Sequence, residues 1–207
     1  MPLSHLLPPV QPTDPRGPRG KLATRRALLT VRDAMTAEAR AAAALAIGDA
    51  TNMLLARRLS PDAVVAIYAA KGSEVDTARI DAALRAAGMT VAYPRVVPHQ
   101  RRLVFHAVPL DALATAQLGL REPSADAAAV ELADIAAFIV PGLAFDRAGG
   151  RIGWGRGHYD ATFAAASPDA LRIGLAYDCQ LVEHVAREPH DVALHIIITE
   201  VATHVVV

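Results

Sequence analysis

Residues 135–160 read IAAFIVPGLAFDRAGGRIGWGRGHYD, which joins a strand pattern to a glycine-rich segment. The first six residues form a short, continuous apolar run, and such a run is typical of a strand buried on both faces. Pro141 and Gly142 then end the strand. Glycine loses the most backbone freedom on folding, so the density of glycine between 142 and 157 indicates tight turns or a close approach to a ligand. We therefore expect a central strand that leads directly into a binding loop.

The residues on either side of this stretch alternate between strand and helix patterns. Apolar runs predict strands at 63–68, 90–93, 103–107, 172–176 and 194–199, the second of them stopped by Pro94. Helix-forming residues predict helices at 21–59, 77–87, 111–118 and 159–166, and Thr36 is an N-cap that would divide the first. Residues 126–132 fit either type. The alternation predicts a mostly parallel sheet covered by helices on both faces, a three-layer α/β/α fold.

Composition limits the classes of function. The 207 residues suit one domain, expected at 20–207, after a flexible proline-rich extension at 1–19. Lys and Arg number 21, as do Asp and Glu, so no overall field attracts nucleic acid or an anionic membrane. No apolar stretch is long enough to span a bilayer. With one cysteine no intrachain disulfide can form, and we expect a cytoplasmic protein.

The glycine-rich segment has the composition of an anion-binding loop. Successive exposed backbone N–H groups make an anion-binding concavity, and the guanidinium groups of Arg147, Arg151 and Arg156 match phosphate oxygens. The loop is not a Walker A motif, because Gly155-Arg156 leads to Gly157, and it lacks the Rossmann glycine spacing. A surface hairpin with solvated arginines fits the same residues, and this alternative stays open.

For two further groups of side chains, the sequence fits either ligand binding or a purely structural role. Lys21 and Arg25 stand four apart on an expected helix and share a face, either to grip an anion or as a solvated basic face. Glu74 follows a buried strand, where a carboxylate can reach a ligand. The alternative for its segment is a helix cap.

Asp160 and Asp191 are candidate Mg²⁺ ligands. Magnesium typically takes one or two protein carboxylates together with substrate phosphates and water. Asp160 would otherwise supply favourable charge at a helix start, and Asp191 would be a turn residue near Pro189.

The segment 145–160 resembles the signature of the 5-formyltetrahydrofolate cyclo-ligases. Further similar segments follow in the family's order, at Lys21 and Arg25, 74–77 (EVDT), 93–96 (YPRV), 119–123 (GLREP) and 188–192 (EPHDV). The resemblance covers about residues 21–200. Two positions depart from the usual pattern: Thr24 stands where leucine is common, and His158 replaces the first of two adjacent aromatic residues.

The resemblance implies a fold like that of phosphosugar isomerases and CoA transferases. It also implies an ATP-dependent enzyme that cyclises 5-formyltetrahydrofolate to 5,10-methenyltetrahydrofolate with the help of Mg²⁺. ATP and the reduced folate would be its partners, without nucleic acid or membrane, and we expect a monomer. Arg156 and Tyr159 would be catalytic, Glu74 and Tyr159 would bind folate, and Asp160 and Asp191 would bind the metal. The ATP site would comprise Lys21, Arg25, Gly149, Arg151, Gly153, Trp154, Gly155, Arg156, Gly157, His158 and Tyr159.

Two other functions also fit such a chain. The first is another ATP-dependent ligase or kinase on the same scaffold, and the second is a non-catalytic relative that binds a nucleotide or RNA. Zero net charge and only 4% aromatic residues argue against RNA, since binders of single strands combine basic grooves with stacking rings.

Overall fold

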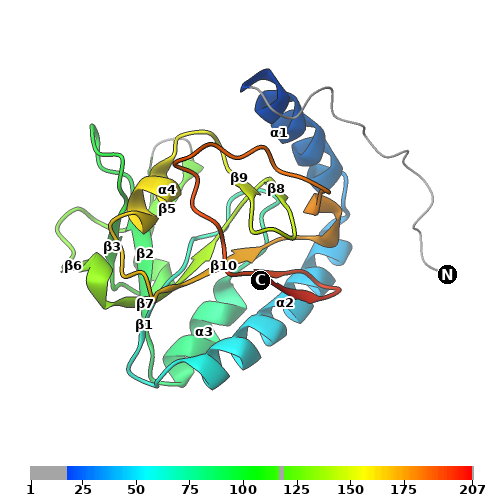
Figure 1. Ribbon diagram of the computed structural model, residues 1–207. Coiled ribbons are helices and arrows are strands. Elements are labelled where there is room, and N and C mark those ends of the chain that lie inside the picture. Colours follow the sequence, from blue (N-terminus) through cyan, green and yellow to red (C-terminus); the bar gives the residue numbers. More distant parts are fainter. Residues whose placement is uncertain (1–17, 117–118, 207) are drawn as a thin grey trace.

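A sheet of eight strands forms the centre of the computed structural model, which describes residues 18–116 and 119–206 (Figure 1). Its order is β12-β11-β10-β7-β1-β2-β3-β6. The five strands from β11 to β2 are mutually parallel, and β12, β3 and β6 pair antiparallel at the two edges. The prediction of a mostly parallel sheet is therefore confirmed. The bounds are β1 Val64–Ala66, β2 Thr90–Arg95, β3 Val104–His106, β6 Ala129–Val130, β7 Ile135–Val140, β10 Leu171–Leu175, β11 Ile196–Ile198 and β12 Thr203–Val205.

Strand β7 lies between β10 and β1, and its side chains alternate between two hydrophobic cores. Ala137 and Ile139 pack on the face covered by α2 (Ala37–Arg58) and α3 (Ala78–Ala86). Phe138 packs on the opposite face, where its ring meets Phe163 of α4 (His158–Phe163) edge-on at 5.5 Å. Both faces of the sheet are thus covered, as its continuous apolar strands require.

The N-terminal helical region divides where the sequence predicts. Helix α1 (Pro18–Asp33) ends before Thr36, whose extended backbone precedes α2 and whose side chain accepts a hydrogen bond from Ala39 N at 3.1 Å. Because α1 begins at Pro18, residues 18 and 19 belong to a helix and not to the expected extension. The rest of that extension, 1–17, lies outside the described residues. No helix in the two described ranges is long and apolar enough to cross a membrane.

Replacing Thr36 with alanine tests this cap. We expect Thr36→Ala to lower the free energy of unfolding by about 1 kcal/mol, since the N–H of Ala39 loses its acceptor. Urea denaturation measures the change. Thr36→Ser keeps a hydroxyl acceptor and should recover most of the loss, so an equal loss in both variants would contradict the capping role.

Two expectations about the middle of the chain are wrong. A helix was expected over 111–118, but the described part forms a single 3₁₀ turn (Leu110–Ala112) and strand β4 (Ala114–Thr115). Strand β4 pairs with β5 (Arg121–Glu122), and Gly119 turns the chain between them with φ 68°. Residues 117–118 lie outside the described residues. Tertiary pairing has overridden the helix propensity of Ala and Leu.

Strand β2 does not stop at Pro94. The pairing of β2 with β1 ends at Ala92, and beyond it β2 pairs with β3 alone, Pro94 opposite Phe105. A strand with a partner on one side tolerates a proline, which has no N–H to donate. The ambiguous segment 126–132 contains the short edge strand β6, and the predicted helix at 159–166 ends earlier, at Phe163.

Candidate active site

The first half of the glycine-rich segment is a tightly bonded hairpin. Strands β8 (Ala144–Phe145) and β9 (Arg151–Ile152) are joined by a turn around Asp146, whose side chain is 1% exposed. Its Oδ1 accepts hydrogen bonds from Ala148 N at 3.0 Å and Gly150 N at 2.7 Å, and its Oδ2 accepts one from Val185 N at 2.7 Å. This half is therefore closer to the hairpin alternative than to an open anion loop.

Gly149 is required by the shape of this turn. Its φ is 80°, and a Cβ atom there would lie 2.5 Å from the carbonyl oxygen of Leu194. Its N–H already donates to the carbonyl of Asp146 at 3.0 Å. That amide is thus used within the hairpin. The sequence interpretation overlooked Asp146, although an aspartate two and four residues before backbone donors is a known signal of a side-chain-stabilised turn.

The second half, residues 153–157, is an exposed loop suited to a ligand. Gly155 and Gly157 have φ values of 88° and 66°, and Gly157 directly precedes α4. The guanidinium of Arg25 on α1 donates to the carbonyl of Gly153 at 2.8 Å and so ties the loop to that helix. Arg156 is exposed, and within 18–116 and 119–206 its side chain has no hydrogen bond or ion pair. A free guanidinium on a loop can reach an incoming anion.

Each candidate metal ligand contacts a candidate phosphate-binding cation. Lys21 Nζ lies 3.0 Å from Asp191 Oδ2, and Arg151 Nη2 lies 3.6 Å from Asp160 Oδ2. Lys21 is therefore not part of a solvated face. Burial of the Arg151 side chain lowers its pKa, and the nearby Asp160, Tyr159 and Asp191 oppose that shift. The Nε of Arg151 has no hydrogen-bond partner among the described residues. It has unused donor capacity in the site.

The two carboxylates lie on adjacent segments. Val192 N donates to Asp160 Oδ1 at 3.2 Å, and Val192 directly follows Asp191. Burial by itself would raise the pKa of Asp191, but the hydrogen bond from Glu188 N and the contact with Lys21 outweigh it, and the pKa is lowered. Asp191 is thus ionised at neutral pH. Carboxylates on two adjacent segments, together with the phosphate oxygens of a bound nucleotide, would form a donor set that suits Mg²⁺.

Glu74 comes to the same side of the molecule from the loop between β1 and α3. Its Oε2 accepts from Lys71 N at 3.0 Å, and its Oε1 lies 3.5 Å from Trp154 Nε1. Burial raises the pKa of Glu74. The capping alternative applies to Asp76, whose Oδ1 accepts from Ala78 N at the start of α3, while the side chain of the N-cap residue Thr77 makes no capping bond. The carboxylate of Glu74 takes no part in that cap, and its Oε1 lies beside Trp154 of the 153–157 loop.

His158 and Tyr159 close the site at the start of α4. His158 Nδ1 lies 2.8 Å from the carbonyl oxygen of Arg101, and its buried Nε2 has no partner among the described residues. The guanidinium of Arg151 lies over the Tyr159 ring, 5.1 Å from its centre. Burial raises the pKa of Tyr159, so its hydroxyl stays protonated at neutral pH.

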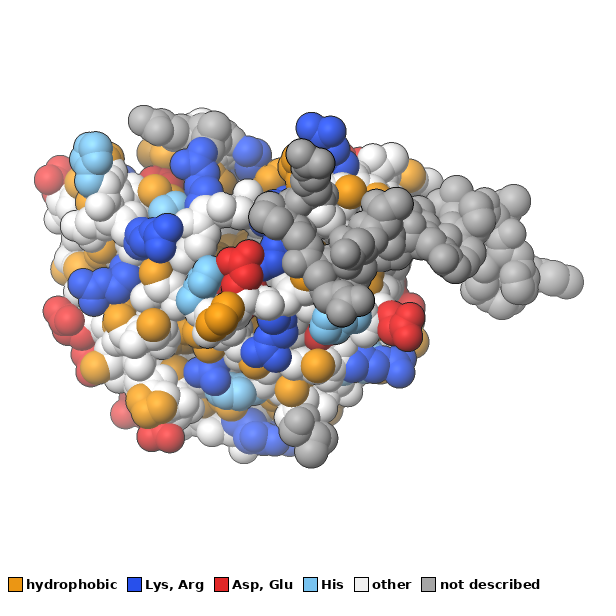
Figure 2. All heavy atoms as spheres, turned by 45° about the horizontal axis from the view of Figure 1, so that its top comes forward, with side chains coloured by type: hydrophobic (Ala, Val, Ile, Leu, Met, Phe, Trp, Pro, Cys, Tyr) orange, Lys and Arg blue, Asp and Glu red, His pale blue; other side chains and the backbone are white. Residues whose placement is uncertain are grey.

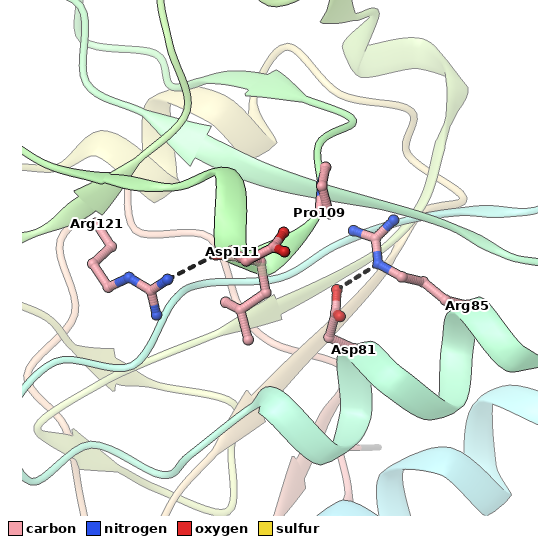
Figure 3. A pocket seen from close by; sticks show the side chains of 6 residues that line it. Asp81, Arg85, Pro109, Asp111 and Arg121 are labelled. Carbon is pink, nitrogen blue, oxygen red and sulfur yellow. Dashed lines mark hydrogen bonds and ion pairs between the residues drawn. The ribbon is translucent and has the colours of Figure 1, made fainter.

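These contacts assemble residues that are far apart in the sequence at one end of the sheet, beyond the carboxyl end of β7, where ligands bind in such folds. Figure 2 turns the upper side of Figure 1 toward the viewer and shows basic side chains spread over it. A hollow of about 380 Å³ lies elsewhere, against α3 (Figure 3). Its arginines are already bound, Arg85 to Asp81 and Arg121 to the carbonyl of Leu110, which fits a structural role.

Comparisons with known proteins agree with the sequence resemblance. The family model described as 5-formyltetrahydrofolate cyclo-ligase matches residues 18–200. The 5-formyltetrahydrofolate cyclo-ligase of Mycolicibacterium smegmatis is 40% identical over 90 residues, which are 42% of this chain and 45% of that protein. The aligned region thus spans less than half of that relative. The Escherichia coli K12 cyclo-ligase is 32% identical over 139 residues, 65% of this chain and 76% of that protein.

A solved structure shows the same fold. The NMR structure of Aquifex aeolicus 5,10-methenyltetrahydrofolate synthetase matches with a TM-score of 0.77 at 24% identity, covering 90% of this chain and 92% of that one. The likeness extends over nearly all of both chains and shows that they share their fold. From the family match and this fold together, the chain belongs to the 5-formyltetrahydrofolate cyclo-ligase family.

Proposed function

We propose that this protein catalyses the ATP-dependent cyclisation of 5-formyltetrahydrofolate to 5,10-methenyltetrahydrofolate, with release of ADP and phosphate. The observation that carries the proposal is that Lys21 of α1 contacts Asp191 while Arg151 contacts Asp160 on the adjacent segment, with Arg25 of α1 bonded to the loop carbonyl of Gly153. Cations for a triphosphate and carboxylates for its counter-ion are thus found side by side, within a family whose members are named for this reaction.

The reaction requires positioning more than a protein nucleophile. The formyl oxygen takes the terminal phosphoryl group of ATP and ADP leaves. The N10 amine then forms its bond to the formyl carbon and gives up its proton, and the C–O bond breaks so that the oxygen leaves as part of phosphate. Charge develops mainly on phosphate oxygens, where fixed cations stabilise it. Lys21, Arg25, Arg151 and Arg156 would supply these cations, together with the exposed backbone of 153–157.

The remaining side chains would hold the metal and the folate. Asp160 and Asp191 would bind Mg²⁺, which neutralises phosphate oxygens when it is bound with ATP. Glu74 would accept hydrogen bonds from the folate, and Tyr159, protonated and partly buried, would line the wall between the two ligands. Two polar atoms beside this wall have no partner among the described residues: Nε of Arg151, which donates, and Nε2 of His158, which accepts because Nδ1 donates to the carbonyl of Arg101.

A direct assay tests the proposal. Protein mixed with ATP, Mg²⁺ and 5-formyltetrahydrofolate should produce the absorbance of the methenyl product, and omission of ATP should abolish the signal. ATP hydrolysis without any methenyl product would instead support another ligase or kinase. Binding of RNA that weakens steeply with salt, measured by filter retention, would support the nucleic-acid alternative.

A further inference from the structure

One side-chain contact joins the two halves of the candidate site. Trp154 from the glycine-rich segment reaches Glu74 from the β1–α3 loop, 80 positions away in the sequence, with Nε1 at 3.5 Å from Oε1. The tryptophan lies on the side proposed for ATP and the glutamate on the side proposed for folate.

The position of Trp154 is set by its backbone more than by packing. Its side chain is 55% exposed, which is unusual for so large an apolar group. The residue before it, Gly153, is tied to Arg25 through its carbonyl, and the residue after it, Gly155, is in the left-handed region. The loop thus holds the indole N–H toward Glu74 without burying the ring in the core.

The Glu74 carboxylate depends on the donors around it. Burial favours its neutral form, and the opposing contributions come from the backbone N–H and charge of Lys71, from Arg32 on α1 and from the Trp154 N–H. The hydroxyl of Tyr177 donates to the backbone carbonyl of Glu74 at 3.4 Å and fixes the main chain. The side chain of Glu74 is oriented by one donor on each carboxylate oxygen. Lys71 N donates to Oε2 and Trp154 Nε1 donates to Oε1.

We propose that Trp154 is a positioning residue, which holds the Glu74 carboxylate turned to accept hydrogen bonds from the reduced folate. The proposal rests on the proposed function. The pterin ring of a folate carries adjacent N–H donors, which a carboxylate of fixed orientation receives in a bidentate manner. Because Arg25 anchors Gly153, the orientation of Glu74 also depends on a cation assigned to the nucleotide side.

Trp154→Phe removes the donor and keeps an aromatic ring. We expect the KM for 5-formyltetrahydrofolate to rise about five-fold, the size of effect of one weak hydrogen bond, and to rise more than the KM for ATP. The Trp154 N–H lowers the pKa of Glu74, so its loss should raise that pKa. The acidic limb of the pH profile of kcat/KM for the folate should then move to higher pH. The melting temperature should stay unchanged, because Trp154→Phe replaces one exposed ring with another.

A double-mutant cycle separates positioning from direct contact. If Trp154 acts through Glu74, Trp154→Phe has no further effect on the folate KM in a Glu74→Gln background. In the wild-type background, Trp154→His keeps a ring N–H and should show a smaller rise in the folate KM than Trp154→Phe. An unchanged folate KM and pH profile in Trp154→Phe, or an equal further loss in the Glu74→Gln background, overturns the proposal.

Calorimetric titration with 5-formyltetrahydrofolate distinguishes failure of this inference from failure of the proposed function. Wild-type protein that binds the folate without cyclising it, and binds it about five-fold more weakly as Trp154→Phe, would overturn the function and support the positioning role. If the wild type cyclises the folate, and the wild type and Trp154→Phe bind it with equal affinity, the proposed function would be supported and the positioning role overturned. Absence of folate binding by wild type would overturn both.

Discussion

Asp146→Ala should lower the free energy of unfolding by about 3–5 kcal/mol, the largest stability change that we expect in this protein. Three backbone N–H groups, of Ala148, Gly150 and Val185, donate to this one carboxylate. The N–H groups of Gly150 and Val185 are buried beside it, so without it they stay unpaired and out of reach of water, whereas the N–H of the exposed Ala148 can turn to solvent. Urea denaturation followed by circular dichroism measures the change, and the cyclisation rate should fall with it because the β8–β9 hairpin supports the loop at 153–157.

Two controls sharpen this expectation. Asp146→Asn keeps one acceptor oxygen, so it should lose less stability than the alanine variant, while its amide would oppose one of the N–H donors. Asp169→Ala removes an exposed aspartate and should change stability by less than about 0.5 kcal/mol. If Asp146→Ala were as stable as Asp169→Ala, the hairpin would not depend on this carboxylate.

Arg156→Ala should lower kcat/KM for ATP without unfolding the protein. The loss of one charge-assisted contact with phosphate is worth about 1.5–3 kcal/mol, or roughly 10- to 150-fold in rate. The fold should persist because this side chain is exposed and unbonded within the described residues. Steady-state cyclisation kinetics, with a thermal melt of the same sample, measure both parts.

Arg147 provides a matched control, since it is an exposed arginine nine positions earlier in the same glycine-rich segment. It lies on the β8–β9 turn and not on the 153–157 loop, so Arg147→Ala should retain the wild-type rate. Arg156→Lys keeps the charge but loses the two-pronged geometry and should fall between the alanine variant and the wild type. Unchanged kinetics in Arg156→Ala would remove that residue from the site.

Local patterns in the sequence were sufficient to predict most of the framework. The apolar runs at 63–68 and 135–140 gave β1 and β7, and Thr36 gave the break between α1 and α2, because burial and capping leave short-range signals. Residues 111–116 misled the prediction for the opposite reason. Their conformation is decided by pairing with Arg121 and Glu122, which competes with and defeats local helix propensity.

The site was predictable as a set of residues and not as a set of contacts. Composition and family resemblance pointed to Lys21, Asp160 and Asp191, but the pairing of Lys21 with Asp191 spans 170 positions and follows from how α1 packs against the fold. The Trp154–Glu74 contact is equally non-local. Asp146 carried a local signal, yet its third bond, to Val185, depends on a distant segment. Whether the candidate residues bind ATP, folate and metal stays a prediction.

The separation between Lys21 and Asp191 also has a consequence for biosynthesis. A polypeptide grows on the ribosome from its amino terminus, so Lys21 is made 170 residues before the carboxylate that pairs with it. During that interval Lys21 lacks the carboxylate of Asp191. A nascent chain interrupted before position 191 would lack this pairing, and the candidate site would stay incomplete until that position has been made.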